Sequence, residues 1–135
     1  MHRIWSERPI PSRYLPLLKA QAEACGSSYD TLNDPYATLP GSDAVIAASR
    51  IRYDATFFDR VSTVRAVCRT GIGYDNIDVD VATSYGVAVC NAPNAPTSAT
   101  AEHTVAMMFA VTKQLKGSDR TIARGAVSDF MEVNP

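Results

Sequence analysis

The 135-residue sequence has no excess of charge and no long apolar run. It carries 13 lysines and arginines against 14 acidic residues, for a net charge of −1, so electrostatics give no case for a nucleic-acid or anionic-membrane partner. The longest apolar run, Val105–Val111, is far shorter than the roughly 20 residues needed to span a bilayer. The first residues lack the apolar core of a secretion signal. We therefore expect a soluble, cytoplasmic protein.

Metal-binding and catalytic patterns are missing as well. The three cysteines, Cys25, Cys68 and Cys90, are odd in number and lack metal-type spacing, so we expect reduced, buried thiols and no bound metal. No serine or cysteine lies in a nucleophile elbow or beside a base. Glu102 and His103 are adjacent in sequence, and adjacent helical side chains do not face one another. We expect that pair to be structural and no catalytic residue to lie in this chain.

The dinucleotide-binding fingerprint is absent too. That fingerprint needs glycine at the first, third and sixth positions of a turn that leads from a strand into a helix. Gly71 and Gly73 supply the first two positions, but Asn76 occupies the sixth. None of the seven glycines completes the pattern elsewhere. The loop that would hold a dinucleotide pyrophosphate is therefore not expected in this chain.

The segment that contains these two glycines, Arg69–Asp78, is nevertheless the centre of the sequence, and we call it the glycine loop. The apolar run before it, Arg65–Cys68, is typical of a buried strand. Its last residue is a good N-cap for a helix over Val79–Tyr85, which Gly86 would end. The loop thus follows the carboxyl end of a strand, where open α/β sheets bind ligands. Its glycines permit unusual φ angles and a close ligand approach, and its free N–H groups suit a carboxylate.

Alternating strands and helices predict a doubly wound, mostly parallel α/β sheet of the Rossmann-like or flavodoxin-like kind, followed by a long helix. The remaining predicted strands end at Trp5 or span Ser28–Leu32, Ala44–Ala48 and Val87–Cys90, and the remaining predicted helices span Ser12–Ala24, Asp54–Phe58 and Ser98–Leu115. From Lys116 onward the helical pattern ends, which predicts a connector.

Two features bear on ligands and partners. Within the long helix, Val105–Val111 is apolar on every face, so we expect another domain or subunit to cover what the sheet does not. Arg50 follows the third strand and is predicted at the same sheet edge as the glycine loop. It either meets an anionic substrate or is a solvated loop arginine. The chain thus has the features of a substrate-holding part without its own catalytic groups.

Four blocks of sequence resemble the NAD(P)-dependent D-isomer-specific 2-hydroxyacid dehydrogenases in their order and spacing. The blocks are Arg69–Asp78, Gly86–Val89, Asn91–Pro93 and Thr100–His103. Members of that family have two Rossmann-like domains with the active site in the cleft between them. The resemblance implies a substrate-binding α/β domain over residues 1–97, an interdomain helix over 98–117, and a connector to a missing NAD-binding domain over 118–135.

The resemblance also implies roles for individual positions. The backbone amides of Ile72 and Gly73, next to Gly71, match those that hold the substrate carboxylate in the family. Other positions match residues that line the substrate pocket or face the nicotinamide ring. The pocket positions are Ala48, Ser49 and Ala95, and the nicotinamide position is Thr100.

Two departures from the family limit what this chain does alone. Pro96 stands where many relatives have an asparagine, which disfavours a formate dehydrogenase. The family's catalytic arginine, glutamate and histidine, and its glycine-rich cofactor loop, lie beyond residue 135. The complete enzyme is expected to use NAD or NADP, to act on a small 2-oxo or 2-hydroxy acid and to form a homodimer. This chain alone is expected to be inactive and not to bind the cofactor tightly.

Two other functions are consistent with the sequence. One is a stand-alone binding module for small carboxylates, which would show affinity for a 2-oxo acid without any cofactor domain. The other is a corepressor-like protein-interaction domain, since the family includes dinucleotide-sensing transcriptional corepressors. In that case a specific protein would dock on Val105–Val111.

Overall fold

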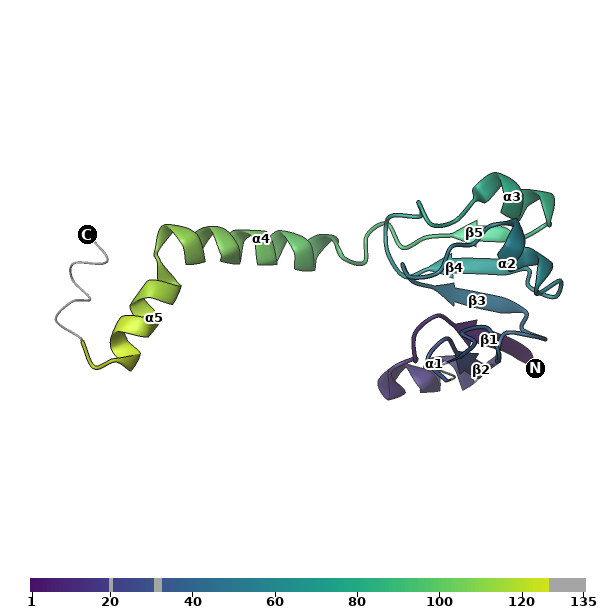
Figure 1. Cartoon of the computed structure of the whole chain (residues 1–135), viewed down its shortest axis with the longest axis horizontal. Helices are drawn as coiled ribbons and strands as arrows, with labels where there is room; N and C mark the ends of the chain where they lie inside the picture. The colour runs from purple at the N-terminus through teal and green to yellow at the C-terminus, as the bar shows by residue number, and fades with distance from the viewer. Residues whose placement is uncertain (20, 31–32, 127–135) are drawn as a thin grey trace. The chain divides into compact units, whose positions relative to one another are not determined.

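The computed structural model describes residues 1–19, 21–30 and 33–126. The chain divides into two units, Met1–Ala95 and Pro96–Pro135. The first unit contains a parallel five-stranded sheet in the order β2-β1-β3-β4-β5 (Figure 1). The strands are β1 (His2–Ser6), β2 (Ala22–Ser27), β3 (Ala44–Ala47), β4 (Ala66–Arg69) and β5 (Ala88–Cys90).

Helices flank both faces of this sheet, as the doubly wound prediction requires. The connection from β1 to β2, through the 3-10 helix η1 (Ser12–Tyr14) and α1 (Leu15–Lys19), runs across the sheet in one direction. The connections through α2 (Ala55–Asp59) and α3 (Val79–Ser84) run in the other direction. Right-handed crossovers therefore place α1 on one face and both later helices on the opposite face. The predicted α/β fold class is confirmed.

The hydrophobic core lies on the face that carries α2 and α3. Trp5, Val45 and Val67 are neighbours in the sheet register and are fully buried. The rings of Phe57 and Phe58 in α2 pack edge-on at 5.3 Å and belong to the same cluster. Side chains of α1 line a separate cavity of about 430 Å³ together with Ile46, which points to the opposite face. One face of the sheet thus holds the main core.

Local signals predicted the elements around the glycine loop correctly. The β3, β4 and β5 strands lie within one residue of their predicted bounds. Asp54 and Asp78 are the N-caps of α2 and α3, and their side chains accept hydrogen bonds from Phe57 N and Val81 N. Gly86 has a φ of +70° after α3, which is the left-handed conformation that ends many helices.

The predicted helix over Ser12–Ala24 is wrong at its carboxyl half. The helix α1 ends at Lys19, and Ala22 already begins β2, which pairs with β1. Gly26, expected to end the helix, lies in β2 with a φ of +143° at a shift in the strand register. A Cβ there would lie 2.4 Å from Thr38 Cβ, so only glycine fits. Pairing with β1 outweighs the local helical pattern.

The strand predicted at Ser28–Leu32 is also wrong where it can be compared. Residues 28–30 form a turn, in which Asp30 accepts a hydrogen bond from Ser27 N at 2.5 Å. Thr31 and Leu32 lie outside the described residues. The true second strand precedes this segment.

The second unit contains two helices rather than one helix and a connector. Helix α4 (Thr97–Thr112) matches the long predicted helix, although it ends three residues earlier. Gln114 then adopts a left-handed conformation with a φ of +48°, and α5 (Leu115–Ala123) begins directly after it. The end of the predicted connector, residues 127–135, lies outside the described residues. The polar composition of α5 hid this helix from the apolar pattern.

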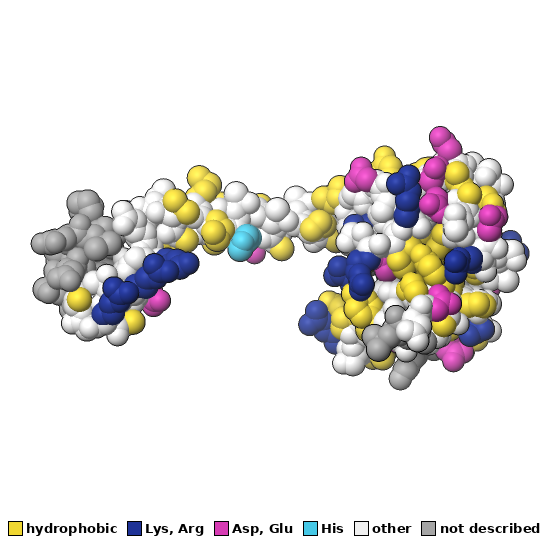
Figure 2. All heavy atoms as spheres, viewed as in Figure 1, with side chains coloured by type: hydrophobic (Ala, Val, Ile, Leu, Met, Phe, Trp, Pro, Cys, Tyr) yellow, Lys and Arg dark blue, Asp and Glu magenta, His cyan; other side chains and the backbone are white. Residues whose placement is uncertain are grey.

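Helix α4 has no buried residue and exposes apolar side chains along its length (Figure 2). The large exposed ones are Val105, Met107, Met108, Phe109 and Val111. Within the described part of the chain, no helix is long and apolar enough to cross a membrane. The described residues of the second unit therefore do not bury α4.

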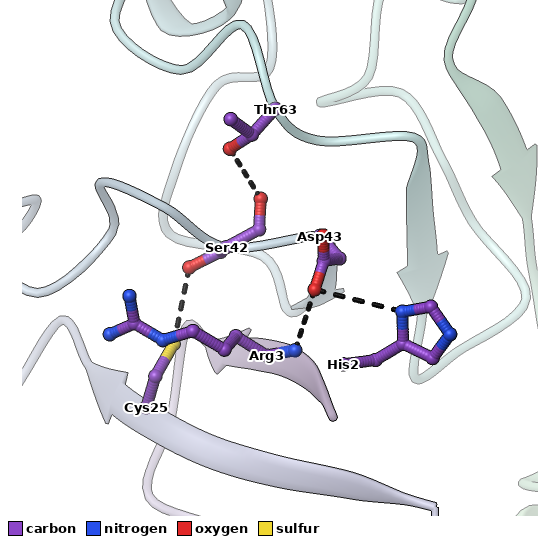
Figure 3. Close-up of polar contacts among 6 residues, drawn as sticks. All are labelled: His2, Arg3, Cys25, Ser42, Asp43 and Thr63. Atoms are coloured by element: carbon purple, nitrogen blue, oxygen red, sulfur yellow. Dashed lines mark hydrogen bonds and ion pairs between the residues drawn. The ribbon is translucent and has the colours of Figure 1, made fainter.

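Polar contacts join the strands just before β3 (Figure 3). The Asp43 carboxylate accepts a hydrogen bond from Arg3 N at 2.7 Å, and His2 Nδ1 lies 3.7 Å from the same carboxylate. Beside it, the Ser42 hydroxyl lies 3.1 Å from Cys25 Sγ, and the Ser42 carbonyl accepts a hydrogen bond from Thr63 Oγ1. These contacts connect the start of β3 to the sequence-distant strands β1 and β2.

The cysteines depart from the prediction of buried thiols. All three are free, but Cys68 and Cys90 are exposed and Cys25 is half-buried. Cys68 and Cys90 lie on the face opposite the main core, since they alternate with the buried Val67 and half-buried Val89. The apolar runs around them are strands that only one face of the sheet buries.

Candidate carboxylate-binding site

The glycine loop and the loop after β3 form one braced edge of the sheet. Thr70, directly after β4, donates its backbone N–H to Ala47 O at 3.0 Å. The Asn76 side chain donates to Ala48 O at 2.9 Å and to Ile51 O at 2.7 Å. The residue that breaks the dinucleotide fingerprint therefore has a structural role, which is to tie the two loops together.

A second brace comes from the segment after β5. Asn91 Nδ2 donates to Ile72 O at 2.9 Å, and Ala92 N donates to Gly71 O at 3.1 Å. Two carbonyls of the glycine loop are thus held by the neighbouring strand end. The amide N–H groups of Ile72 and Gly73 donate to no protein acceptor in the described part of the chain. Two adjacent donors are consequently available to a ligand at the carboxyl edge of the sheet.

The glycines in this loop matter because they leave room for neighbouring groups, not because they adopt unusual φ angles. Neither Gly71 nor Gly73 has a positive φ, so the unusual φ angles that glycine permits are not used here. A Cβ at Gly71 would lie 3.1 Å from Arg69 Nη1, and one at Gly73 would lie 3.3 Å from Asp75 Oδ2. The absence of side chains lets the flanking charged groups approach the loop backbone closely.

Arg69 is a cation of this site to which the sequence analysis gave no role. It is the last residue of β4, and its guanidinium lies next to Gly71. Its Nε is buried and has no hydrogen-bond partner among the described residues, while Nη1 donates to Thr70 Oγ1 at 3.4 Å. The loop thus carries a half-buried guanidinium beside Gly71 and the Asp75 carboxylate beside Gly73. The sequence offered one signal for this role, namely an arginine at the end of a predicted strand, just before the two glycines.

Glu7 is the second residue without a predicted role. Its side chain is 0% exposed and accepts hydrogen bonds from the backbone N–H groups of Ala48 and Arg50, each at 2.6 Å. Ile51 N and the Tyr53 hydroxyl also donate to it, at 3.3 and 2.8 Å. Burial, and then the negative charge of Glu7, raise the pKa of Tyr53, so its hydroxyl stays protonated as a donor. A carboxylate that directly follows β1 thus fixes the loop after β3.

The predicted site residues after β3 divide into one buried and two exposed positions. Ala48 is buried, whereas Ser49 and Arg50 are exposed. The Arg50 guanidinium lies over the ring of Tyr29, 4.8 Å from its centre. Glu7 binds the amides of Ala48, Arg50 and Ile51, and the exposed side chains of Ser49 and Arg50 remain for a ligand. The backbone N–H of Ala48 helps to hold the loop in place, and its role as a pocket residue stays a prediction.

The other predicted positions lie further along the chain. Ala95 is exposed and is the last residue of the first unit. Thr100 belongs to the second unit, in the first turn of α4, where its N–H donates to Pro96 O at 2.9 Å. The first unit by itself therefore brings together Gly71, Ile72 and Gly73 with the loop after β3.

No cluster of three or more metal-ligating side chains occurs in residues 1–19, 21–30 and 33–126. The third glycine of the dinucleotide fingerprint allows close packing of the helix against the sheet, whereas Asn76 stands at that position here and its side chain ties the two loops together.

Comparison with known proteins decides the family. The model of the D-isomer specific 2-hydroxyacid dehydrogenase catalytic domain matches residues 9–134. The chain belongs to this family. It is 34% identical over 87 residues to D-3-phosphoglycerate dehydrogenase of Archaeoglobus fulgidus, covering 64% of this chain and 16% of that protein. It is 35% identical over 83 residues to glyoxylate reductase of Pyrococcus furiosus, covering 62% and 25%.

Solved structures of the family share the fold. D-lactate dehydrogenase of Aquifex aeolicus, crystallised with NAD and lactic acid, superposes with a TM-score of 0.72 at 17% identity, over 91% of this chain and 37% of that one. A Thermus thermophilus protein superposes with a TM-score of 0.75 at 25% identity, over 92% and 41%. This chain is a 2-hydroxyacid dehydrogenase domain that spans less than half the length of these proteins.

Proposed function

We propose that this chain is the substrate-binding part of an oxidoreductase that transfers a hydride between NAD(P)(H) and a small 2-oxo or 2-hydroxy acid. The pair of unoccupied amides at Ile72 and Gly73 is the observation that carries this proposal. A carboxylate is the one group that all substrates of this class share, and it is the anion that such a pair of donors suits. Family membership over residues 9–134 supports the reaction class.

The substrate carboxylate would accept hydrogen bonds from both amides, with the Arg69 guanidinium close by. Hydrogen bonds to a charged group contribute roughly 1.5–3 kcal/mol each. The braces from Asn76 and Asn91 hold the amides in place before the ligand arrives. Binding therefore requires little rearrangement of the loop, which favours affinity.

Orientation is what this chain contributes to the reaction. A nicotinamide held by another part of the complete protein would supply or accept the hydride. With its carboxylate fixed at the glycine loop, the substrate presents its adjacent C2 carbon in one direction. Holding two reactants in register lowers the barrier by avoiding the loss of their freedom during the reaction. The exposed side chains of Ser49 and Arg50 would contact the remainder of the substrate at the same edge.

The test is a titration of the ¹⁵N-labelled chain with pyruvate or glyoxylate, followed by amide chemical shifts. We expect the largest shifts at Ile72 and Gly73. Arg69→Gln should weaken binding about tenfold, which corresponds to about 1.4 kcal/mol. Arg65→Gln is the matched control, because Arg65 is exposed and precedes the amino end of the same strand. Shifts confined to other residues, or equal affinities for both variants, would overturn the proposed site.

A turnover assay separates the enzyme proposal from a simple carboxylate-binding module. This chain alone should not oxidise NADH or NADPH in the presence of a 2-oxo acid, since its described residues include no dinucleotide cradle. The protein purified from its natural source should do so if the chain is part of the complete enzyme. Binding of the acid without turnover by the natural protein would favour the binding module.

A further inference from the structure

Two exposed cysteines occupy neighbouring positions on adjacent strands. Cys68 of β4 and Cys90 of β5 are direct partners in the parallel register. Adjacent strands lie about 4.7–4.9 Å apart, which falls inside the roughly 4.4–6.8 Å range of Cα separations in disulfides. Paired positions in a sheet also project their side chains to the same face. The backbone thus holds these two thiols at a separation that a disulfide can bridge.

Solvent reaches both thiols. Each cysteine is exposed, and a cavity of about 200 Å³ lined by Tyr74, Val79, Val89, Cys90 and Asn91 opens beside the second of them. Cys25 differs, because it is half-buried and its sulfur lies 3.1 Å from the Ser42 hydroxyl. A small thiol reagent therefore meets the pair on β4 and β5 more readily than the third cysteine.

We propose that Cys68 and Cys90 form a dithiol site that reacts with low-molecular-weight disulfides, such as oxidised glutathione, to give an intrachain disulfide. One cysteine thiolate attacks the small disulfide, forms a mixed disulfide and releases one glutathione thiolate. The second cysteine thiolate then attacks the protein sulfur of the mixed disulfide and releases the other glutathione. The protein loses two electrons and two protons, and one oxidised glutathione becomes two reduced ones.

The pair lies directly before the two segments that build the candidate carboxylate site. Cys68 precedes Arg69, and Cys90 precedes Asn91, whose side chain holds the Ile72 carbonyl. A disulfide would therefore join the strand ends from which both segments start. Partial desolvation by its neighbours, and then contact with Cys90, raise the pKa of Cys68. The exchange should accordingly accelerate as the pH rises above neutrality, because the thiolate is the reacting species.

The experiment treats the purified, fully reduced chain with oxidised glutathione at mildly alkaline pH and measures intact mass and tryptic peptides. We expect the mass to fall by two hydrogens, and a peptide pair linked through Cys68 and Cys90 that dithiothreitol separates. Cys25→Ser should behave in the same way. Cys68→Ser and Cys90→Ser should each keep a glutathione adduct on the remaining partner instead of losing two hydrogens.

Three results would overturn the proposal. The first is a wild-type chain that keeps all its thiols reduced under conditions that oxidise free cysteine. The second is a stable glutathione adduct on Cys68 or Cys90 with no ring closure. The third is a disulfide to Cys25 or to a second chain in place of the predicted link. Because Cys68→Ser and Cys90→Ser replace a thiol by a hydroxyl at exposed positions, we expect them to fold, and circular dichroism checks this for all three variants.

Discussion

Glu7 is a buried carboxylate whose partners are more than 40 residues away in the sequence. Three backbone amides and one tyrosine hydroxyl surround it, so the loop after β3 encloses an anion that the protein itself supplies. In the glycine loop next to it, the amides of Ile72 and Gly73 have no protein acceptor among the described residues. Backbone amides that donate to a carboxylate thus have a structural role in one loop and, in our proposal, a ligand-binding role in the other.

Replacing Glu7 by glutamine tests this structural role. The glutamine side chain would place an NH₂ group, which is a donor, where Glu7 has an acceptor oxygen. At least one buried N–H would then lose its acceptor. We expect Glu7→Gln to lower the free energy of unfolding in urea by about 2–3 kcal/mol. Glu23→Gln on the exposed side of β2 is the control and should change it by less than about 0.5 kcal/mol. Equal effects of the two substitutions would contradict the role assigned to Glu7.

The elements were predictable where their determinants are local. Asp54 and Asp78 cap helices within three residues of themselves, and the strands from Ala44 to Cys90 are short apolar runs bounded by turns. The β2 strand was missed because its pairing with β1 is not visible in a window that also fits a helix. Glu7 and Arg69 were missed because their significance depends on groups brought together only by the fold.

The start of β3 offers a pH test at the scale of elements. The hydrogen bond from Arg3 N, with the nearby His2, lowers the pKa of Asp43. A lowered folded-state pKa stabilises the protein above the unfolded-state pKa, and this contribution is lost as the pH falls through the folded-state pKa.

We therefore expect Asp43→Asn to lower the urea midpoint at pH 7, and the difference from the wild type to shrink below about pH 5 and to vanish in stronger acid. The substituted asparagine would still offer an oxygen to Arg3 N, so the comparison isolates the charge. Asp75→Asn removes another exposed carboxylate from the same unit and serves as the control. A difference between wild type and Asp43→Asn that is independent of pH would refute the assignment.

At the scale of the whole molecule, the two units have different relations to solvent. The first unit buries a core on one face of its sheet. The second unit presents α4, which buries no residue and exposes large apolar side chains. Contiguous apolar surface of this kind marks interfaces or aggregation sites. A second copy of the chain or a further domain would bury the apolar surface of α4, which agrees with the homodimer expected from the family resemblance.

Sedimentation velocity tests this expectation for the isolated chain. We expect the wild type to associate, and Phe109→Glu to shift the distribution towards the monomer because it places a charge in the apolar surface. Ser98→Glu adds the same charge near the start of α4, away from the large exposed side chains, and should leave association unchanged. A wild-type chain that stays monomeric at high concentration would disprove this account of α4.

The single tryptophan belongs to the core of the first unit, and this gives the chain a built-in spectroscopic probe. Trp5 is fully buried in β1, and its indole N–H donates to Thr38 Oγ1 at 3.0 Å. Its fluorescence therefore reports on Met1–Ala95 alone, whereas far-ultraviolet circular dichroism also includes α4 and α5. Two units that unfold separately would give two non-coincident denaturation curves. The protein thus carries, without labelling, the means to follow its sheet independently of its helices.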